Sequence, residues 1–441
     1  MKINFFKSTG FRYFIVIILL LFVARMVEKY NDSQYEDSRS PYLQMLGKNQ
    51  VTIKWQGLKK EKVILKYGTN RASLNLTKIS EKASFEHTIT LNNLSENTQY
   101  FYQIAKKIYT FKTAPNKNSN DASLFWVLGD PGNASNLLLN VKKSAYRWLE
   151  NNHRRQNFDL ILTTGDNAYT SGKNQQYQEA IFNVHKEELS SVNLWPAYGN
   201  HDARRWAFFD IFDFPTQAQL GGVASTTEEY FSFNYADVHF VFLNSEISAF
   251  FHTDAMIDWL KKDLSQNQSK WTVVLFHSPP YTKGSHDSDN LKDSWGKMHY
   301  MRENVLPILE KHSVDMVLSG HSHSYERSHL LHCHYGDSTT FKQEMVLDDD
   351  GIYQKNSNKY PYDGTLYAVI GSSSKVDISD LDHPALPIAK NSGGSLIIKT
   401  HNNVLQGYFL DDKGMVLDNF SIDKSNHNAL QKTPRQLKKC K

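Results

Sequence analysis

The chain has 441 residues, of which 40% are hydrophobic and 22% are charged, and its formal net charge is +4 at pH 7. This length exceeds a single typical core and predicts two or three domains, and the composition is that of an ordinary globular protein. The small net charge gives no support for nucleic acid as a partner, and we expect none.

The N-terminal segment 1–27 carries a compartment signal. Three basic residues precede an apolar run from residue 13 to residue 24, which is the layout of a secretory signal. The run is short for a membrane span, which needs about 20 apolar residues, but no clear cleavage site of small residues follows it. We interpret this segment as a signal peptide or an uncleaved signal anchor. The protein is expected to be exported, secreted or periplasmic, and membrane anchorage through residues 13–24 stays open.

Residues 28–40 are polar and predict a linker, and residues 41–116 have the pattern of β-strands. Val51, Ile53 and Trp55 alternate with polar residues, which gives each strand one buried and one solvated face. A Leu followed by a Tyr that enters a strand, at Leu94–Tyr100, resembles the tyrosine corner of sandwich domains. This stretch predicts an all-β fibronectin type III-like sandwich that carries no catalytic residue.

Strands and helices alternate from residue 122 to residue 423, which predicts a second domain of the α/β class. Its strands are apolar on both faces and are therefore expected to be covered by helices on both sides. Expected strands span residues 124–128, 158–162, 194–198, 238–243, 271–276 and 314–318. Beyond residue 365 the pattern returns to paired strands.

The C-terminal residues 424–441 are assigned to a polar, basic tail, which is predicted to be disordered from residue 426. Cys440 lies in this tail, and Cys333 is the other cysteine of the chain. The two can pair in an oxidising compartment, but we do not expect the bond because one partner is in the tail. The fold would then depend on its hydrophobic core alone.

Five strand ends carry residue types that bind metal ions. They supply Asp130, Asp166 with Tyr169, Asn200 with His201, His277, and finally His321 with His323. Any one of these sets alone predicts no more than an ordinary turn or loop. Because the sets follow one another at one end of a sheet, where α/β proteins place their ligands, together they predict a metal cluster.

The residue types in this cluster suit two metal ions that share a bridging carboxylate, and Asp166 is the natural bridge. One ion would be completed by Asp130, Tyr169 and His323, and the other by Asn200, His277 and His321. A tyrosinate ligand favours Fe(III) at the first position. Such a pair polarises a phosphoryl oxygen and lowers the pKa of a bound water, which gives a metal-activated hydroxide as nucleophile. His201 and His286 are the candidates for protonating the leaving oxygen.

The motif set resembles the signature of the calcineurin-like metallophosphoesterases. Its members here are Gly-Asp-x-Gly, Gly-Asp-x-x-Tyr, Gly-Asn-His-Asp, a His after an apolar strand, and Gly-His-x-His. Tyr169, Tyr325-Glu326-Arg327 and the segment Pro41-Tyr42-Leu43-Gln44 are similar to the purple acid phosphatases in particular. The resemblance covers roughly residues 41–423.

This resemblance implies a four-layer α/β/β/α catalytic domain and the hydrolysis of phosphomonoesters at a dinuclear Fe(III)–M(II) centre, where M is Zn, Mn or Fe. It implies the metal ligands Asp130, Asp166, Tyr169, Asn200, His277, His321 and His323. It also implies that His201 contacts the phosphate and assists the leaving group, and that the partner is a small phosphoester substrate. No further cofactor is expected.

Two positions depart from the family pattern. Plant members often carry Glu where this chain has Asp202, and a pair of histidines about where it has Ser285-His286-Asp287. One histidine of that pair remains, so His286 is retained as a predicted proton donor. Asp287 either orients it or has no role.

Three functions remain open at this point. The leading interpretation is a phosphomonoesterase of the purple acid phosphatase type, and the alternative is a phosphodiesterase or nucleotidase with the same metal centre. A remote alternative is a non-catalytic exported binding protein, which predicts that ligands have been lost, whereas all seven are present. The physiological substrate, the second metal, the pH optimum and the oligomeric state are not determined by the sequence.

Overall fold

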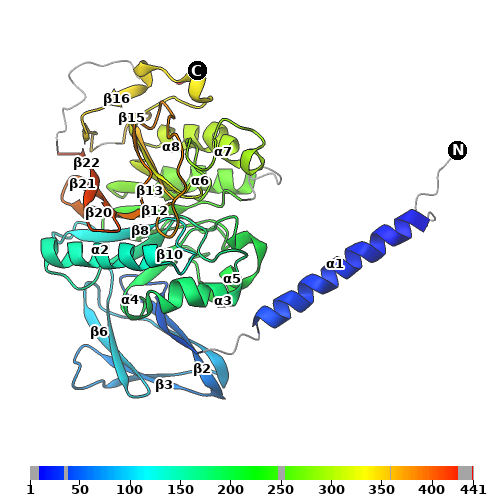
Figure 1. Ribbon diagram of the computed structural model, residues 1–441. Helices are drawn as coiled ribbons and strands as arrows, with labels where there is room; N and C mark the ends of the chain where they lie inside the picture. Colours follow the sequence, from blue (N-terminus) through cyan, green and yellow to red (C-terminus); the bar gives the residue numbers. More distant parts are fainter. Residues whose placement is uncertain (1–8, 34–37, 247–253, 358, 426–439, 441) are drawn as a thin grey trace.

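The structure is a computed structural model that describes the chain except for residues 1–8, 34–37, 247–253, 358, 426–439 and 441. Figure 1 shows a large α/β body with a smaller β-sandwich below it and one long helix, α1 (Thr9–Ser33), that projects away from the body. The α/β body and the preceding sandwich confirm the predicted fold class.

The larger sheet of the body has ten strands, and β8, β9 and β10 run parallel to one another near its centre. In spatial order the strands are β17 (Ile352–Gln354), β22 (Val416–Asp423), β21 (Val404–Asp411), β20 (Gly394–His401), β8 (Ser123–Leu128), β9 (Leu160–Thr163), β10 (Asn193–Pro196), β1 (Arg39–Gln44), β2 (Val51–Glu61) and β5 (Ser84–Leu91). All side chains of β8, β9 and β10 are buried, which agrees with strands covered on both faces.

The second sheet of the body also has a parallel centre, formed by β12, β13, β14 and β18. Its strands are β11 (Phe231–Tyr235), β12 (Val238–Phe242), β13 (Trp271–Leu275), β14 (Met316–Ser319), β18 (Thr365–Ile370), β15 (Tyr325–Leu331) and β16 (Val346–Asp348), with β19 (Ile388–Lys390) paired to β15. The two sheets face each other: the Phe125 ring on β8 meets the rings of Tyr235 and Phe240 edge-on at 5.7 and 5.1 Å.

Helices cover the outer face of each sheet. The helix α2 (Asn136–His153) packs on the first sheet through an apolar stripe that includes Leu138, Val141 and Leu149. It begins where the Ser135 side chain accepts a hydrogen bond from the Leu138 N–H, a common N-terminal cap. On the second sheet lie α6 (Asp254–Gln266), α7 (Lys297–Tyr300) and α8 (Leu306–Lys311). The resulting order of helix, sheet, sheet and helix is the four-layer arrangement.

Short helical segments fill the connections between the strands. They are α3 (Asn174–Tyr177), η2 (Gln178–Asn183), α4 (Lys186–Leu189), η3 (Asp202–Arg204), α5 (Ala207–Ile211), η4 (Asp293–Gly296), η5 (Met301–Val305), η6 (Ser338–Thr340) and η7 (Gln343–Met345). The segment η3 immediately follows the predicted site residue His201, and η4 begins seven residues after His286.

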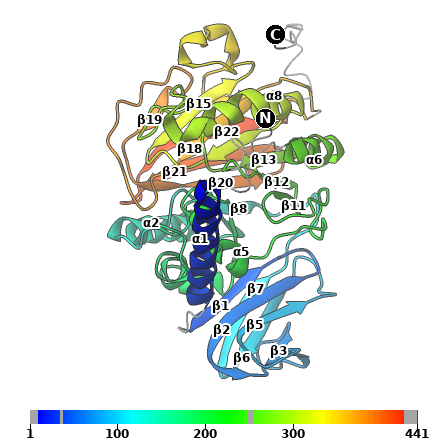
Figure 2. The same ribbon diagram turned by 90° about the vertical axis from the view of Figure 1, so that its right-hand side faces the viewer.

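The N-terminal sandwich is not separate from the body. Its sheet of β3 (Ile64–Gly68), β4 (Leu76–Ile79), β6 (Gln99–Ile104) and β7 (Lys107–Lys112) lies opposite β1, β2 and β5 (Figure 2). The β1 strand also pairs in parallel with β10 of the body, with Leu43 opposite Asn193. One sheet therefore continues from the sandwich into the α/β body. The Tyr100 hydroxyl accepts a hydrogen bond from the Ser95 N–H at 2.9 Å, the type of contact that a tyrosine corner makes.

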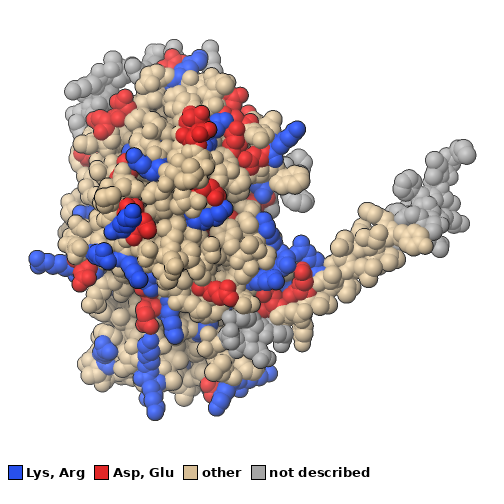
Figure 3. All heavy atoms as spheres, in the orientation of Figure 1, with Lys and Arg blue, Asp and Glu red and all other residues tan. Residues whose placement is uncertain are grey.

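The long helix α1 replaces the first part of the predicted linker 28–40, because the helix continues to Ser33 and β1 already begins at Arg39. Its last turns contact the body: Arg205 pairs with Glu28 at 3.3 Å, and Lys29 lies over the Trp206 ring at 5.0 Å. Figure 3 shows charged atoms gathered at the base of the helix and an uncharged surface along its projecting part. Among the described residues, no helix has the combined length and apolar character of a membrane span.

The C-terminal segment corrects two expectations. Lys424, which was assigned to the tail, is buried in the body, and its Nζ lies 2.8 Å from the Asp315 carboxylate. Cys440 is joined to Cys333 by a disulfide, although we did not expect the bond. The structure places Cys440 beside the rim of the body, where the Tyr335 hydroxyl donates to its Sγ at 3.4 Å. The tail prediction for residues 426–439 lies outside the described residues.

Candidate metal centre

The predicted site residues follow strands whose carboxyl ends point in the same direction within each sheet. Asp130 follows β8, Asp166 follows β9 and Asn200 follows β10, all in the first sheet. His277 follows β13 and His321 follows β14 in the second sheet. Since the two sheets face each other, their strand ends bring these side chains to one place between them.

The backbone of the strand-end loops is tightly packed. A Cβ on Gly320 would lie 2.2 Å from the Asp130 Oδ1, and one on Gly129 would lie 1.1 Å from the Ile370 carbonyl oxygen. Only glycine fits at these two positions. Asp130, Asp166 and His321 themselves have positive φ angles of 51, 52 and 68°. Such strained backbone is found most often at functional sites.

The first group of donor atoms consists of Asp130, Tyr169 and His323. The Tyr169 hydroxyl lies 3.0 Å from the Asp130 Oδ2 and 3.1 Å from the His323 Nε2. The His323 Nε2 is 3.5 Å from the same carboxylate oxygen. Burial, followed by the charges of Asp130 and Asp166, raises the pKa of Tyr169 well above its usual value. A cation would have to replace the phenol proton before this tyrosine could act as a tyrosinate ligand.

The second group of donor atoms surrounds the His277 Nε2. This nitrogen lies 3.0 Å from the Asn200 Oδ1, 3.2 Å from the His321 Nδ1 and 3.4 Å from the Asp166 Oδ1. The other ring nitrogen of His277, Nδ1, lies 2.9 Å from the Thr164 carbonyl oxygen and must donate its proton there. In a neutral His277 ring, Nε2 then carries a lone pair, which faces the lone pairs of the neighbouring acceptor atoms.

This arrangement requires a positive charge between the atoms of the second group. Burial lowers the pKa of His277, but the carboxylates of Asp166 and Asp130 outweigh this effect and raise it to about 10. The surroundings thus attract a proton to this position, and a metal ion can supply the same charge. Ligand atoms of Asp130, Asp166 and His277 all lie within 4.8 Å of one another, which suits a metal ion. The donor set therefore fits metal binding.

Asp166 lies between the two groups. It faces His277 of the second group at 3.4 Å, and its charge acts on Tyr169 of the first group. Its Oδ1 also accepts a hydrogen bond from the His201 N–H at 2.8 Å. Burial raises the pKa of Asp166, but His277 and His201 outweigh it, so the pKa lies well below the usual range. Asp166 is therefore placed as a bridging carboxylate would be.

The two predicted proton donors lie at the edges of this cluster. His201 packs edge-on against the Tyr169 ring at 4.5 Å, and its Nδ1 lies 2.6 Å from the Thr170 carbonyl oxygen. His286 stacks on His321 in the second group. Both histidine side chains are partly exposed, at 22% and 30%, whereas His277 is fully buried. They can therefore meet a substrate that arrives from solvent.

Three carboxylates near the site, those of Asp377, Asp293 and Asp202, were not assigned a role from the sequence. Asp377 lies 2.6 Å from the His323 Nδ1, and Asp293 lies 2.8 Å from the His286 Nδ1. Asp287, which the sequence placed next to His286, pairs instead with Lys283 at 2.6 Å. No sequence motif marks Asp377 or Asp293, because each reaches its histidine from a loop whose path depends on the fold.

Asp202 is the third of these carboxylates and joins three loops. It is fully buried and accepts hydrogen bonds from the N–H groups of Gly199 and Asn167 and from the Tyr177 hydroxyl at 2.6 Å. Burial and the nearby Asp166 raise the pKa of Asp202 to about 7. Its hydrogen bonds hold the loops after β9 and β10 together beneath the donor atoms. Asp202 thus has a structural role in the site.

Arg327 donates to the Ser328 carbonyl oxygen at 3.0 Å and also contacts a carboxylate on β22. Its guanidinium makes a two-point contact with Asp418, at 2.6 and 3.0 Å. Glu326 is buried separately and accepts hydrogen bonds from Thr282 and Ser324 at 2.5 and 2.9 Å. The segment after the last histidine motif therefore anchors the loop to both sheets and contributes no donor atom.

Comparisons with known proteins agree with this fold. Residues 123–325 match the family model described as Calcineurin-like phosphoesterase. Purple acid phosphatase 22 of Arabidopsis thaliana is 27% identical over 324 residues, which cover 68% of each chain. Purple acid phosphatase 21 of the same plant is 27% identical over 252 residues, 55% of this chain and 53% of the relative. The chain thus spans between about half and two thirds of these relatives' lengths.

A solved structure with the same fold is purple acid phosphatase PPD1 from yellow lupin (Lupinus luteus) seeds. Its TM-score is 0.66 at 18% identity, and the match covers 87% of this chain and 74% of that one. The fold, the family match and the relatives define the chain as a metallophosphoesterase of the phosphatase type, a hydrolase that uses metal ions. Within that class the chain is similar in sequence to the two purple acid phosphatases above and shares the fold of PPD1, in agreement with the resemblance of its motifs.

Proposed function

We propose that this protein hydrolyses phosphomonoesters at a pair of metal ions, Fe(III) and a divalent Zn, Mn or Fe ion. The observation that carries the proposal is the pair of donor groups on either side of Asp166, one with a phenol and one built around the His277 Nε2. The first group would hold the Fe(III) ion and the second group the divalent ion. When bound, the two ions would polarise the phosphoryl group and lower the pKa of a water molecule to supply the nucleophile.

The chain's own residues would support the reaction from both sides. The Nδ1 of His201 donates to the Thr170 carbonyl oxygen, which fixes the ring and leaves Nε2 facing the cluster, 3.8 Å from the Asp166 Oδ2. In this position His201 would contact a phosphoryl oxygen and assist the leaving group. His286, held by Asp293, would donate a proton to the leaving oxygen.

Visible absorption tests the assignment of iron and of Tyr169. The full-length protein with iron bound is expected to show a tyrosinate-to-iron charge-transfer band, which Tyr169→Phe abolishes. Tyr408→Phe is the matched control, because Tyr408 lies on β21 far from the donor groups and packs on Trp148. An iron-loaded protein without the band, or a band that survives Tyr169→Phe, would overturn the assignment.

The class of substrate is tested with two synthetic esters of the same alcohol. We expect faster turnover of p-nitrophenyl phosphate than of its bis-ester. The reverse order would favour the alternative, a phosphodiesterase or nucleotidase at the same metal centre. Turnover of neither ester by the metal-loaded protein would favour the remote alternative, a non-catalytic binding protein.

We also infer that the protein is exported. The support is the apolar run in α1, whose side chains are exposed around the whole helix, together with the Cys333–Cys440 disulfide. Disulfides persist mainly in oxidising compartments. Cell fractionation with an antibody against the catalytic body would test this, and recovery in the cytosol alone would refute it.

A further inference from the structure

A second site of interest lies at the opposite end of the strands from the donor groups. A cavity of about 550 Å³ lies where β12, β13 and β14 begin, whereas the metal donors follow the carboxyl ends of β13 and β14. Its wall comes from the connector after the sandwich, the end of α6, the end of α8, Ser357 and Lys359. The volume is in the range of cavities that bind small molecules.

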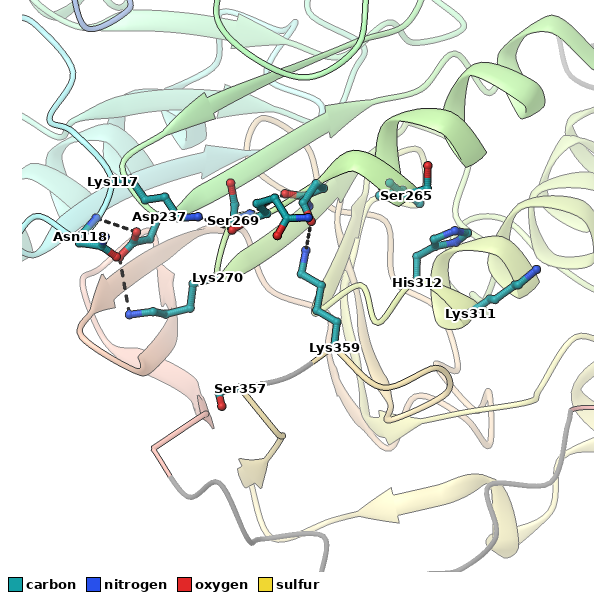
Figure 4. Close-up of a pocket in the computed structure, with 13 residues that line it drawn as sticks. Lys117, Asn118, Asp237, Ser265, Ser269, Lys270, Lys311, His312, Ser357 and Lys359 are labelled. Carbon is teal, nitrogen blue, oxygen red and sulfur yellow. Dashed lines mark hydrogen bonds and ion pairs between the residues drawn. The ribbon is translucent and has the colours of Figure 1, made fainter.

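The charge of this cavity is unbalanced. Its charged lining residues are Lys117, Lys270, Lys311, Lys359 and Asp237, and His312 lies beside them (Figure 4). Asp237 is already engaged, since it lies 3.6 Å from Lys270 and accepts a hydrogen bond from the Asn118 N–H at 2.9 Å. Among the described residues, no carboxylate lies within 4 Å of the other three ammonium groups. Positive charge is therefore left over inside the cavity.

Backbone carbonyls hold the lysines at the wall. The Lys117 Nζ donates to the Gln268 carbonyl oxygen, and the Lys359 Nζ lies 3.2 Å from the Asn267 carbonyl oxygen. Lys270 reaches the Asn402 carbonyl oxygen at 2.9 Å. Each ammonium has three hydrogens, so these contacts position the groups and leave hydrogens for a ligand. In Figure 4 the dashed contacts join Lys270 to Asp237 and Lys359 to the segment around Asn267.

Lys359 is partly buried. Burial lowers its pKa to about 8, and the neighbouring charges of Lys424, Lys355 and Lys117 add to this effect. The carboxylate of Asp315 nearby opposes it but already lies within 3.1 Å of both Lys355 and Lys424. The protein thus does not neutralise Lys359 from within, and a bound anion would.

Another cavity shows that basic lining residues alone do not leave a cavity with unbalanced positive charge. It has a volume of about 520 Å³ beside α2 and is lined by Lys142, Lys143, Arg147 and Arg155. There, however, Lys142 pairs with Glu188 at 2.8 Å, and Arg155 pairs with Asp159 at 2.6 Å. The protein itself neutralises two of its cations, so this cavity serves as an internal control.

We propose that the cavity at the start of β13 binds a phosphate-type oxyanion at a place separate from the metal centre. Inorganic phosphate and the phosphate group of a small organic molecule share the required chemistry, a compact multivalent anion whose oxygens accept hydrogen bonds from several ammonium groups. The proposal does not depend on the catalytic function and stands if the metal assignment fails.

Lysine labelling tests this site without interference from anion binding at the metals. The full-length protein is acetylated briefly with an amine-reactive reagent at constant ionic strength, and each lysine is followed by peptide mass spectrometry. Inorganic phosphate, a sugar phosphonate that cannot be hydrolysed, and chloride are compared. We expect the two phosphorus anions to protect Lys117, Lys270 and Lys359, with labelling about tenfold slower at ten times the Kd. Lys142 and Lys143 should be unaffected.

Two variants make the result specific. Lys359→Gln should weaken the protection of Lys117 and Lys270 at least severalfold, and Lys117→Gln, at an exposed position, tests the site without disturbing the core. Lys143→Gln is the matched control and should leave the protection unchanged. Protection at lower concentrations of the phosphonate than of phosphate would identify an organic ligand, and the reverse would identify inorganic phosphate. Equal protection by chloride, no protection, or protection that survives both cavity variants would overturn the proposal.

Discussion

The imidazole ring of His286 lies flat on that of His321, with ring centroids 3.8 Å apart and an angle of 16° between the planes. Asp293 accepts hydrogen bonds at 2.8 Å from both the His286 Nδ1 and the Ser294 hydroxyl. The Ser294 oxygen in turn lies 2.5 Å from the His321 Nε2. The segment from His286 to Ser294 therefore holds a solvent-facing histidine against one that belongs to the second donor group.

Asp293→Asn should lower kcat about tenfold with little change in KM, because the amide still accepts a hydrogen bond but no longer stabilises a protonated His286. Burial raises the pKa of Asp293, but its hydrogen bonds, first that from His286, outweigh this and lower it to about 2. Wild-type Asp293 is therefore ionised, and able to stabilise a protonated His286, at every pH above the ordinary aspartate pKa of about 4. Steady-state kinetics over a pH series checks this.

Asp287→Asn is the control for that prediction. Asp287 is adjacent to His286 in sequence, but its carboxylate contacts Lys283. We expect kcat within about twofold of the wild type, since surface ion pairs contribute little. A loss as large as that of Asp293→Asn would show that proximity in sequence, and not the hydrogen bond to Asp293, decides the role of His286.

Asp377→Asn should weaken metal retention. Asp377 accepts the Nδ1 proton of His323 at 2.6 Å, which directs Nε2 toward Tyr169 and Asp130. Loss of such a partner of a ligating histidine typically costs about 10- to 100-fold in metal affinity. Metal content after dialysis against a graded series of chelator concentrations measures the effect.

Lys375→Gln is the matched substitution for that measurement. Lys375 also contacts Asp377, at 2.9 Å. Among the described residues, it makes no hydrogen bond to His323. The metal content should follow that of the wild type. If both variants lose metal equally, the loss stems from the surrounding loop and not from the hydrogen bond to the histidine.

Glu310 gives the protein a pH-dependent stability that does not involve the metal site. Burial raises the pKa of Glu310 to about 7, although hydrogen bonds from Cys333, Tyr335 and Tyr367 oppose this effect. The folded state therefore binds a proton between about pH 4.5 and pH 7 that the unfolded state releases. The contribution of Glu310 to the free energy of unfolding is complete below its pKa in the unfolded chain, about 4.3. It is lost as the pH rises through 7.

Glu310→Gln removes this dependence. The difference in unfolding free energy between wild type and variant should fall by about 3 kcal/mol from pH 4 to pH 8. Denaturant unfolding at a series of pH values measures it, and Glu150→Gln, at an exposed position of α2, should give no such slope. A difference that rises with pH would mean that Glu310 is ionised in the folded protein.

The Cys333–Cys440 disulfide closes a segment of 107 residues. A peptide map of the exported protein should contain this cross-link without reductant and lose it after reduction. The double variant Cys333→Ser/Cys440→Ser should unfold at lower denaturant, with a loss of about 2 to 4 kcal/mol. Reductant should then shift the wild type to the same midpoint and leave the double variant unchanged; a reductant effect on the variant would contradict the assignment.

The sequence alone predicted the α/β class and the strand ends that carry donor residues. Strands that are apolar on both faces, such as Leu124–Leu128, can only be buried between layers, so their fold class follows from local pattern. The motif residues follow strands directly, and the direction of a strand fixes where its end points. For this reason Asp130 and His277, which are 147 positions apart, were expected at one place before any contact was known.

Local pattern failed where a residue's partner comes from a distant segment. The Arg327 contact with Asp418 and the Cys333–Cys440 bond join positions about 90 and 107 residues apart. The sequence analysis assigned Lys424 to the start of the tail because it is polar, but the structure shows it buried against Asp315. Nothing in the neighbouring sequence specifies such pairs, because they form only after both sheets have assembled.

The sequence by itself determined the chemistry of the residues that surround the proposed metal pair, since residue types and their spacing after strands are local properties. Only the tertiary structure decided how these side chains are oriented and which hydrogen-bond partners orient them. Thr164, Asp377 and Asp293 fix which nitrogen of His277, His323 and His286 carries a proton, and each reaches its histidine from another loop. Packing of the two sheets sets those approaches, and with them the lone pairs that face a cation.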